Sequence, residues 1–121
     1  MAVPVVRIRR VRVIVDERFG AHFRFHKKLP ISGIEAGADF VVQDWHRCLG
    51  ALEQGAVLHV RSDPGDRWGR IRNVFQTMTT TSPSYLVMAS LDVARHNAVL
   101  RGREMLDHCI GLAREIAGSI D

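Results

Sequence analysis

Three short runs rich in β-branched residues, set apart by glycine, proline and polar clusters, constrain the fold of this chain more than any other feature. Such runs predict strands, and they are Val11–Val15, Phe40–Gln43 and Ala56–Val60. Apolar residues recur every three or four positions in later segments, which predicts three helices. The first two cover residues 67–78 and about 85–100, and a terminal helix after Gly102 ends near Gly118. Strands combined with helices in this order predict the α/β class, with a few-stranded, mainly parallel sheet and C-terminal helices.

The ends of the helices have their own signals. Ser82 followed by Pro83 predicts a helix start, because serine is a good N-cap and proline suits the first helical position. Gly102 predicts an interruption before a terminal helix, whose apolar stripe consists of Met105, Cys109, Leu112 and Ile116. A parallel sheet needs cover on both faces, and so few helices supply little of it. The sequence therefore predicts a surface that needs a partner.

Basic residues are concentrated at the start of the chain, where Arg7, Arg9, Arg10 and Arg12 occur without an acidic neighbour. Residues 1–12 are therefore interpreted as a basic, extended lead-in, and residues 13–118 as one domain. The net charge is +4, but without these four arginines 13 basic residues remain against 13 acidic ones. A neutral body makes nucleic acid an unexpected partner.

Composition excludes several other classes of protein. No long uncharged apolar run and no signal-peptide pattern is visible, so we expect a cytoplasmic protein that does not enter a membrane. Cys48 and Cys109 lie far apart and predict neither a disulfide framework nor a zinc site. His22 and His26 could join His46 or Cys48 around a metal, but their segment is not helical and lacks a recognised ligand spacing. No metal site is predicted.

The second predicted strand ends on an unusual cluster, Gln43-Asp44-Trp45-His46-Arg47. In open α/β sheets ligands bind at the carboxyl ends of strands. The cluster is therefore the candidate functional site.

Two stretches, VIVDERFGAHFRFHKKLPISGIEAGADFVVQDWHRCLGALEQGAVLHV and TMTTTSPSYLVMASLDVAR, resemble the large domain of the ornithine/lysine/arginine decarboxylases. The resemblance spans roughly Val13 to Ile116 and implies part of a pyridoxal-phosphate transferase fold, of the aspartate aminotransferase type. In the family, the Asp of V-D-E bonds the pyridine nitrogen of pyridoxal phosphate, and Asp16 stands there. Phe19 loosely matches a family aromatic or histidine. Thr80 and Ser82 match a segment near the cofactor phosphate or the dimer interface.

The resemblance breaks at the Schiff-base position. The family has S-x-H-K, whose lysine forms the imine, whereas this chain has Asp44, Trp45, His46 and Arg47. A guanidinium stays protonated and is a very poor imine-forming nucleophile, so Arg47 cannot replace the lysine. Asp44 would repel the cofactor phosphate unless Arg47 neutralised its charge. Retention of pyridoxal phosphate is therefore doubtful.

Each site residue also has an ordinary structural interpretation. Asp16 could cap backbone amides or pair with a neighbouring arginine, His46 could be a loop histidine with satisfied hydrogen bonds, and the hydroxyls of Thr80 and Ser82 could serve a helix start. The family's large domain also begins well upstream, and a smaller domain follows it downstream, and neither of these parts fits in 121 residues. We therefore expect a truncated relative that is not a decarboxylase by itself.

Three interpretations of the whole chain remain open. One is a homo-oligomeric or otherwise non-catalytic binding module, and another is a subunit that completes a split enzyme with a partner chain carrying the missing parts. The third is a gene remnant. An exposed apolar face and assembly without cofactor would favour the first, and a neighbouring upstream gene that carries the missing half would favour the second.

Overall fold

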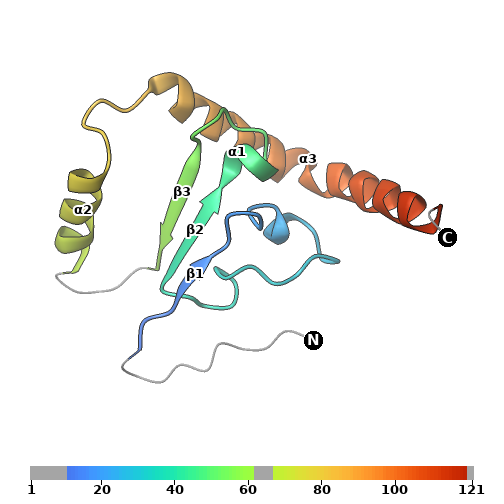
Figure 1. The fold of residues 1–121 in the computed structure, drawn as a ribbon, viewed down its shortest axis with the longest axis horizontal. Helices are drawn as coiled ribbons and strands as arrows, with labels where there is room; N and C mark the ends of the chain where they lie inside the picture. The colour runs from blue at the N-terminus through green and yellow to red at the C-terminus, as the bar shows by residue number, and fades with distance from the viewer. Residues whose placement is uncertain (1–10, 62–66, 120–121) are drawn as a thin grey trace.

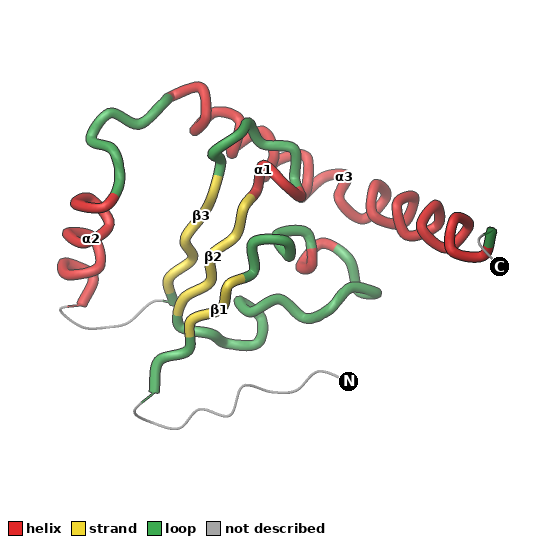
Figure 2. The backbone as a smooth tube through the Cα atoms, viewed as in Figure 1, coloured by secondary structure: helices red, strands yellow, loops and turns green. Residues whose placement is uncertain are grey.

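A computed structural model describes residues 11–61 and 67–119 of the chain. Most of the predicted basic lead-in, residues 1–10, lies outside the described residues. A small sheet occupies the centre, α2 lies on one side of it, and the long helix α3 crosses one end of the sheet and extends beyond it (Figure 1). The tube in Figure 2 shows that the path from the first strand to the second is mostly loop.

The sheet has three strands in the order β1 (Ile14–Asp16), β2 (Phe40–Asp44) and β3 (Ala56–Val60). The predicted α/β class is confirmed. The sheet is mixed rather than mainly parallel, since β1 runs parallel to β2 and β2 runs antiparallel to β3. The reason is the length of the connections. Residues 45–55 are too few for the crossover that parallel strands require, so β3 returns beside β2.

The first strand starts later than predicted, at Ile14 rather than Val11. The side chain of Asp39 explains the difference, because its Oδ2 accepts the hydrogen bond from the Val13 N–H at 3.0 Å. The Val13 carbonyl in turn accepts from the amides of Asp39 and Phe40. The backbone polar groups of Val13 are therefore satisfied outside the regular ladder.

The two faces of the sheet differ in their cover. Val41 is 1% exposed and shares a face with Val15, because both lie within 3.3 Å of the position that a Cβ on Gly33 would take. Strand alternation puts the neighbouring residues on the opposite face. That second face is apolar and more exposed, and Ile14, Phe40, Val42, Leu58 and Val60 form it.

The short helix α1 (Trp45–Cys48) lies between β2 and β3, and the helices α2 (Arg67–Met78) and α3 (Tyr85–Gly118) follow β3. The predicted range of α2 and the end of α3 are confirmed. The predicted N-cap at Ser82 is wrong, because the cap of α3 is Ser84, whose Oγ accepts from the Val87 N–H at 3.4 Å. Among the described residues, no helix combines the length and the apolar character needed to span a bilayer.

The predicted interruption at Gly102 is also wrong, since α3 continues through it. Gly102 is buried where the helix meets the short 3-10 helix η1 (Phe23–Phe25), and a Cβ on Gly102 would lie 3.2 Å from the Cβ of Phe25. Glycine costs about 1 kcal/mol in a helix. Close packing on η1 offsets that cost, so this glycine joins two elements rather than ending one.

Candidate functional site

The parallel pair β1 and β2 ends at one edge of the sheet, where the candidate site residues were predicted to lie. Beyond the last residue pair of the β1–β2 ladder, the two backbone segments remain connected by hydrogen bonds. The amide of Glu17 donates to the Val42 carbonyl at 2.9 Å, and the amide of Asp44 donates to the Arg18 carbonyl at 3.3 Å. These bonds bring the turn after β1 against the start of α1.

Asp16 is solvent-exposed at this edge, with 61% of its side chain accessible. Its Oδ1 accepts from the amide of Arg18 at 3.2 Å and from the Nε of the same residue at 3.0 Å. Asp16 thus both caps a backbone amide and pairs with a neighbouring arginine, which are the two contacts of its ordinary structural interpretation. Its role toward a pyridine nitrogen stays a prediction.

Arg47 contacts both Asp44, which like Arg47 departs from the family pattern, and Phe19, which matches it loosely. The Arg47 Nε lies 3.1 Å from the Asp44 Oδ2, and its guanidinium carbon lies 5.3 Å from the centre of the Phe19 ring. The Asp44 side chain is only 15% exposed, whereas that of Arg47 is 48% exposed. A charge-assisted hydrogen bond and a cation–π contact therefore fix the guanidinium, and Arg47 neutralises Asp44.

His46 belongs to α1 but contacts the turn before β3. Its Nδ1–H donates to the Gly55 carbonyl at 3.2 Å, and its Nε2 lies 3.4 Å from a carboxylate oxygen of Glu53. Both ring nitrogens of His46 therefore have polar neighbours, as the ordinary structural interpretation expected. The residue lies in a short helix, however, rather than in a loop. None of the interactions in the described part of the chain joins it to Asp16 or Asp44.

Thr80 and Ser82 are exposed in the connection between α2 and α3. The amide of Ser82 donates to the Thr80 Oγ1 at 3.1 Å, so these residues form a local turn. Figure 1 shows this connection beside α2, across β3 from β1. The structure brings Asp16, Phe19, Asp44 and Arg47 to one edge and leaves Thr80 and Ser82 apart from them.

A buried polar network beneath this edge was missed by the sequence analysis. Glu17 is 8% exposed, and its carboxylate accepts from the Ser32 hydroxyl at 2.9 Å, the Gly33 amide at 2.8 Å and the Gln43 Nε2 at 2.6 Å. Three donors satisfy a charge that burial would otherwise penalise. The network thereby connects β1, the turn at residues 32–33 and β2.

Gln43 extends the network to two aromatic residues. Its Oε1 accepts from the Trp45 Nε1 at 3.0 Å and from the His59 Nε2 at 2.9 Å. A sequence signal for this residue existed, because Gln43 lies two positions after the apolar Val41 and therefore on the same face of a strand. Polar groups on a buried face require partners.

No activated nucleophile is evident among the described residues. Burial, supported by the negative charge of Asp44, raises the pKa of the Cys48 thiol, which favours the unreactive protonated form. Burial lowers the pKa of His22, although Glu17 partly opposes this change, and the His22 Nδ1 is a buried atom without a hydrogen-bond partner. No group of three metal-ligating side chains occurs in residues 11–61 and 67–119.

Acid is expected to destabilise the fold partly through His59. Burial lowers its pKa below the ordinary 6.5, Arg24 lowers it further, and Glu17 opposes them. As the pH falls below that ordinary value, the unfolded chain binds a proton that the folded chain does not, so stability falls. Urea unfolding between about pH 7.5 and pH 5.5 measures this decline. His59→Gln should reduce the decrease in the free energy of unfolding over this pH range, whereas the control His108→Gln, at an exposed position, should not. Equal slopes for all three proteins would contradict the assignment.

Comparisons with known proteins agree with the resemblance seen in the sequence. A family model described as Orn/Lys/Arg decarboxylase, major domain, matches residues 2–121. The chain is 39% identical to an arginine decarboxylase of Bacillus subtilis over 105 residues, which cover 87% of this chain and 21% of the relative. An arginine decarboxylase of Halalkalibacterium halodurans is 39% identical over 113 residues, covering 93% and 23%. A constitutive lysine decarboxylase of Escherichia coli is 36% identical over 63 residues, covering 52% and 8%.

The chain thus spans between a fifth and a quarter of the length of these arginine decarboxylases. The family match nevertheless covers almost all of the chain. The protein belongs to the Orn/Lys/Arg decarboxylase family and corresponds to part of its major domain.

Proposed function

We propose that this chain is a non-catalytic relative of the basic amino-acid decarboxylases and that it acts as a binding module in an assembly. One observation carries the proposal: Arg47, at the Schiff-base position, is held by Asp44 and Phe19. Decarboxylation on pyridoxal phosphate requires an amine that forms an imine. A protonated guanidinium fixed by a carboxylate cannot provide it.

The residues at the strand ends do not fit covalently held pyridoxal phosphate. The chain contains only two lysines, Lys27 and Lys28, and neither belongs to the motif at residues 44–47. The Lys28 Nζ lies 3.6 Å from a carboxylate oxygen of Asp107 on α3. We therefore expect that any pyridoxal phosphate that binds here does so without a covalent bond, with Asp16 as its candidate partner.

The assembly part of the proposal is supported by exposed apolar side chains. Met78 on α2 is 80% exposed, and Tyr85 and Leu86 at the start of α3 are 83% and 69% exposed. Exposed apolar surface of this kind is typical of protein interfaces. The partner is a second copy or a chain that supplies the missing parts of the large domain. Both cysteines are free, which suits the reducing environment of the cytoplasm.

The proposal predicts that the wild-type protein forms no reducible adduct with pyridoxal phosphate at residue 47. The protein is incubated with the cofactor, its visible absorbance is recorded, and borohydride reduction is followed by peptide mass analysis. Arg47→Lys and the double variant Asp44→Ser/Arg47→Lys restore the amine, the latter without the adjacent carboxylate. We expect the double variant to carry more adduct at residue 47 than the single variant, because Asp44 holds the cation and repels phosphate.

Arg72→Lys is the matched control, since it adds a lysine at an exposed position of α2. Its labelling measures the non-specific background. A stoichiometric adduct in the wild-type protein, lost on replacement of Asp16 by Asn, would contradict the non-catalytic proposal. Absence of adduct at residue 47 in both restored variants would mean that the frame of the cofactor pocket has also been lost.

A further inference from the structure

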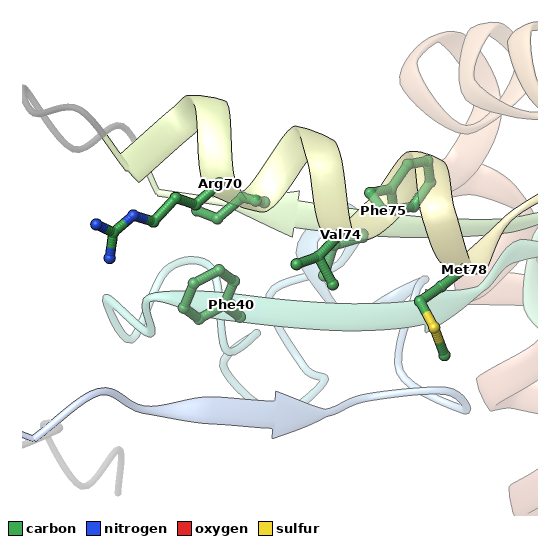
Figure 3. A pocket seen from close by; sticks show the side chains of 7 residues that line it. Phe40, Arg70, Val74, Phe75 and Met78 are labelled. Carbon is green, nitrogen blue, oxygen red and sulfur yellow. The ribbon is translucent and has the colours of Figure 1, made fainter.

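A groove separates α2 from the open face of the sheet. Its apolar part, with a volume of about 410 Å³, is lined from the sheet by Phe40 and Leu58 and from the helix by Ile71, Val74, Phe75 and Met78. Figure 3 shows Phe40 on β2 beneath the Arg70 end of α2, with Val74 further along the helix and Met78 toward its other end. The apolar side chains of the groove are far from fully covered, with Val74 63% and Met78 80% exposed.

The groove continues at the Arg70 end into a second, charged cavity of about 310 Å³. Phe40, Arg70 and Ile71 line both cavities, so the two form one groove. Arg12, Arg61 and Asp39 contribute the other charged groups of the second cavity. Asp39 is ion-paired to Arg12 at 2.9 Å, and the Arg61 Nη1 donates to the Gly37 carbonyl. The cavity therefore has three guanidinium groups against one carboxylate.

Arg70 is the arginine of the groove for which the described residues provide no polar partner. Within the described part of the chain it has no ion pair or hydrogen bond, and its side chain is exposed. The sequence of α2 contains no acidic residue that could neutralise it. An occupant that is apolar along the helix and anionic beside Arg70 would match both parts of the groove.

We propose that this groove binds a segment of a partner protein, and that this segment is apolar along the helix and acidic at the end that lies beside Arg70. The inference rests on the proposed function and deepens it, because it names the surface and the chemistry of the partner. Helix α2 has 12 residues, which at 1.5 Å each give about 18 Å. An extended chain rises about 3.3 Å per residue, so about six residues span the groove. Val74 and Met78 are exposed enough to contact such a segment along the groove.

A peptide-binding assay tests the groove without involving pyridoxal phosphate, so its failure is distinct from failure of the non-catalytic proposal. The probe is a fluorescein-labelled peptide, Leu-Phe-Leu-Ser-Glu-Glu, titrated with the full chain and followed by fluorescence anisotropy. Two matched peptides replace either the glutamates by lysine or the apolar residues by serine. We expect the acidic apolar peptide alone to bind the wild-type protein.

Charge reversal at one position then identifies the site. Arg70→Glu should weaken binding of the acidic peptide by at least about tenfold and should gain binding of the lysine peptide. Arg72→Glu is the matched control, because Arg72 is exposed on the same helix but does not line the groove, and it should change the affinity less than about twofold. Val74→Asp should also weaken binding of the acidic peptide, since it puts a carboxylate into the apolar part of the groove.

Three results would overturn the inference. The first is an equal loss of affinity for the acidic peptide in Arg70→Glu and Arg72→Glu, which would indicate non-specific electrostatic attraction. The second is equal binding of all three peptides, or of none at millimolar protein. The third is a homodimer in sedimentation that Val74→Asp dissociates, which would identify a second copy of the chain as the occupant.

Discussion

Replacement of Glu17 by alanine is expected to lower the free energy of unfolding by about 3 kcal/mol or more, because it leaves several buried donors without an acceptor. The Ser32 hydroxyl, the Gly33 amide and the Gln43 side chain all donate to this carboxylate. Domains of this size are stable by only about 5 to 15 kcal/mol. The substitution should therefore remove a large part of the stability of the fold.

Urea unfolding followed by circular dichroism measures this effect. Glu17→Gln keeps the size of the side chain but turns one oxygen into a donor that faces other donors, so it should be destabilising as well. Glu35→Ala is the control, since Glu35 is an exposed glutamate with no interaction among the described residues. If Glu17→Ala and Glu35→Ala unfold at the same urea concentration, the network is not what holds the strand ends together.

The network also explains how two adjacent carboxylates come to differ. Asp16 and Glu17 are neighbours on one strand end, so alternation sends their side chains to opposite faces. Asp16 reaches solvent and Arg18, whereas Glu17 is buried among donors. The buried acid accepts from Gln43, the residue before Asp44, and so links the turn after β1 to the end of β2.

Local sequence patterns located most elements of the fold. The β-branched runs placed β2 and β3 correctly, and the helical period gave both ends of α2. Two of the errors, at the start of β1 and at Gly102, involve contacts between residues far apart in the sequence. Asp39 takes the hydrogen bond of Val13, which lies 26 positions away, and this shortens β1. No local pattern contains that information.

The candidate site was partly predictable for the same reason. Asp16 and Asp44 end neighbouring strands, so a strand-based interpretation brings them to one edge. The contacts of Arg47 with Phe19 and Asp44 could not all be predicted from spacing alone, because the contact with Phe19 depends on how the turn after β1 meets α1. Thr80 and Ser82 were grouped with the site by resemblance only, and the structure leaves them in a separate turn.

One group of contacts that positions α3 is made with η1 and the residue after it, in addition to the hydrogen bond from the Leu52 amide to Ser90 near the start of the helix. His26 has 5% of its side chain exposed, and its Nδ1 accepts from the Lys28 amide at 3.1 Å. Its Nε2 must therefore carry the proton that it donates to Asp107 on α3 at 3.0 Å. This hydrogen bond lowers the pKa of Asp107. One helical turn and a half earlier, Gly102 lets α3 approach Phe25.

Gly102→Leu is expected to destabilise the protein by about 2 kcal/mol, because overpacking a close contact costs about 1 to 3 kcal/mol. The new Cβ alone would lie 3.2 Å from the Cβ of Phe25, and the rest of the side chain would force α3 away from η1. The contact between His26 and Asp107 would be strained by the same displacement. Urea unfolding measures the loss, and hydrogen exchange at residues 23–28 locates it.

Gly111→Leu separates packing from helix propensity, because Gly111 lies on the same helix with no atom within 4 Å of the position of its Cβ. Leucine is favoured over glycine in a helix by up to about 1 kcal/mol, so Gly111→Leu should stabilise α3 modestly. The same propensity gain acts at Gly102, where the clash must exceed it. Opposite signs for the two substitutions would show that Gly102 is required by the contact with Phe25. Stabilisation by both would mean that α3 is not fixed against η1.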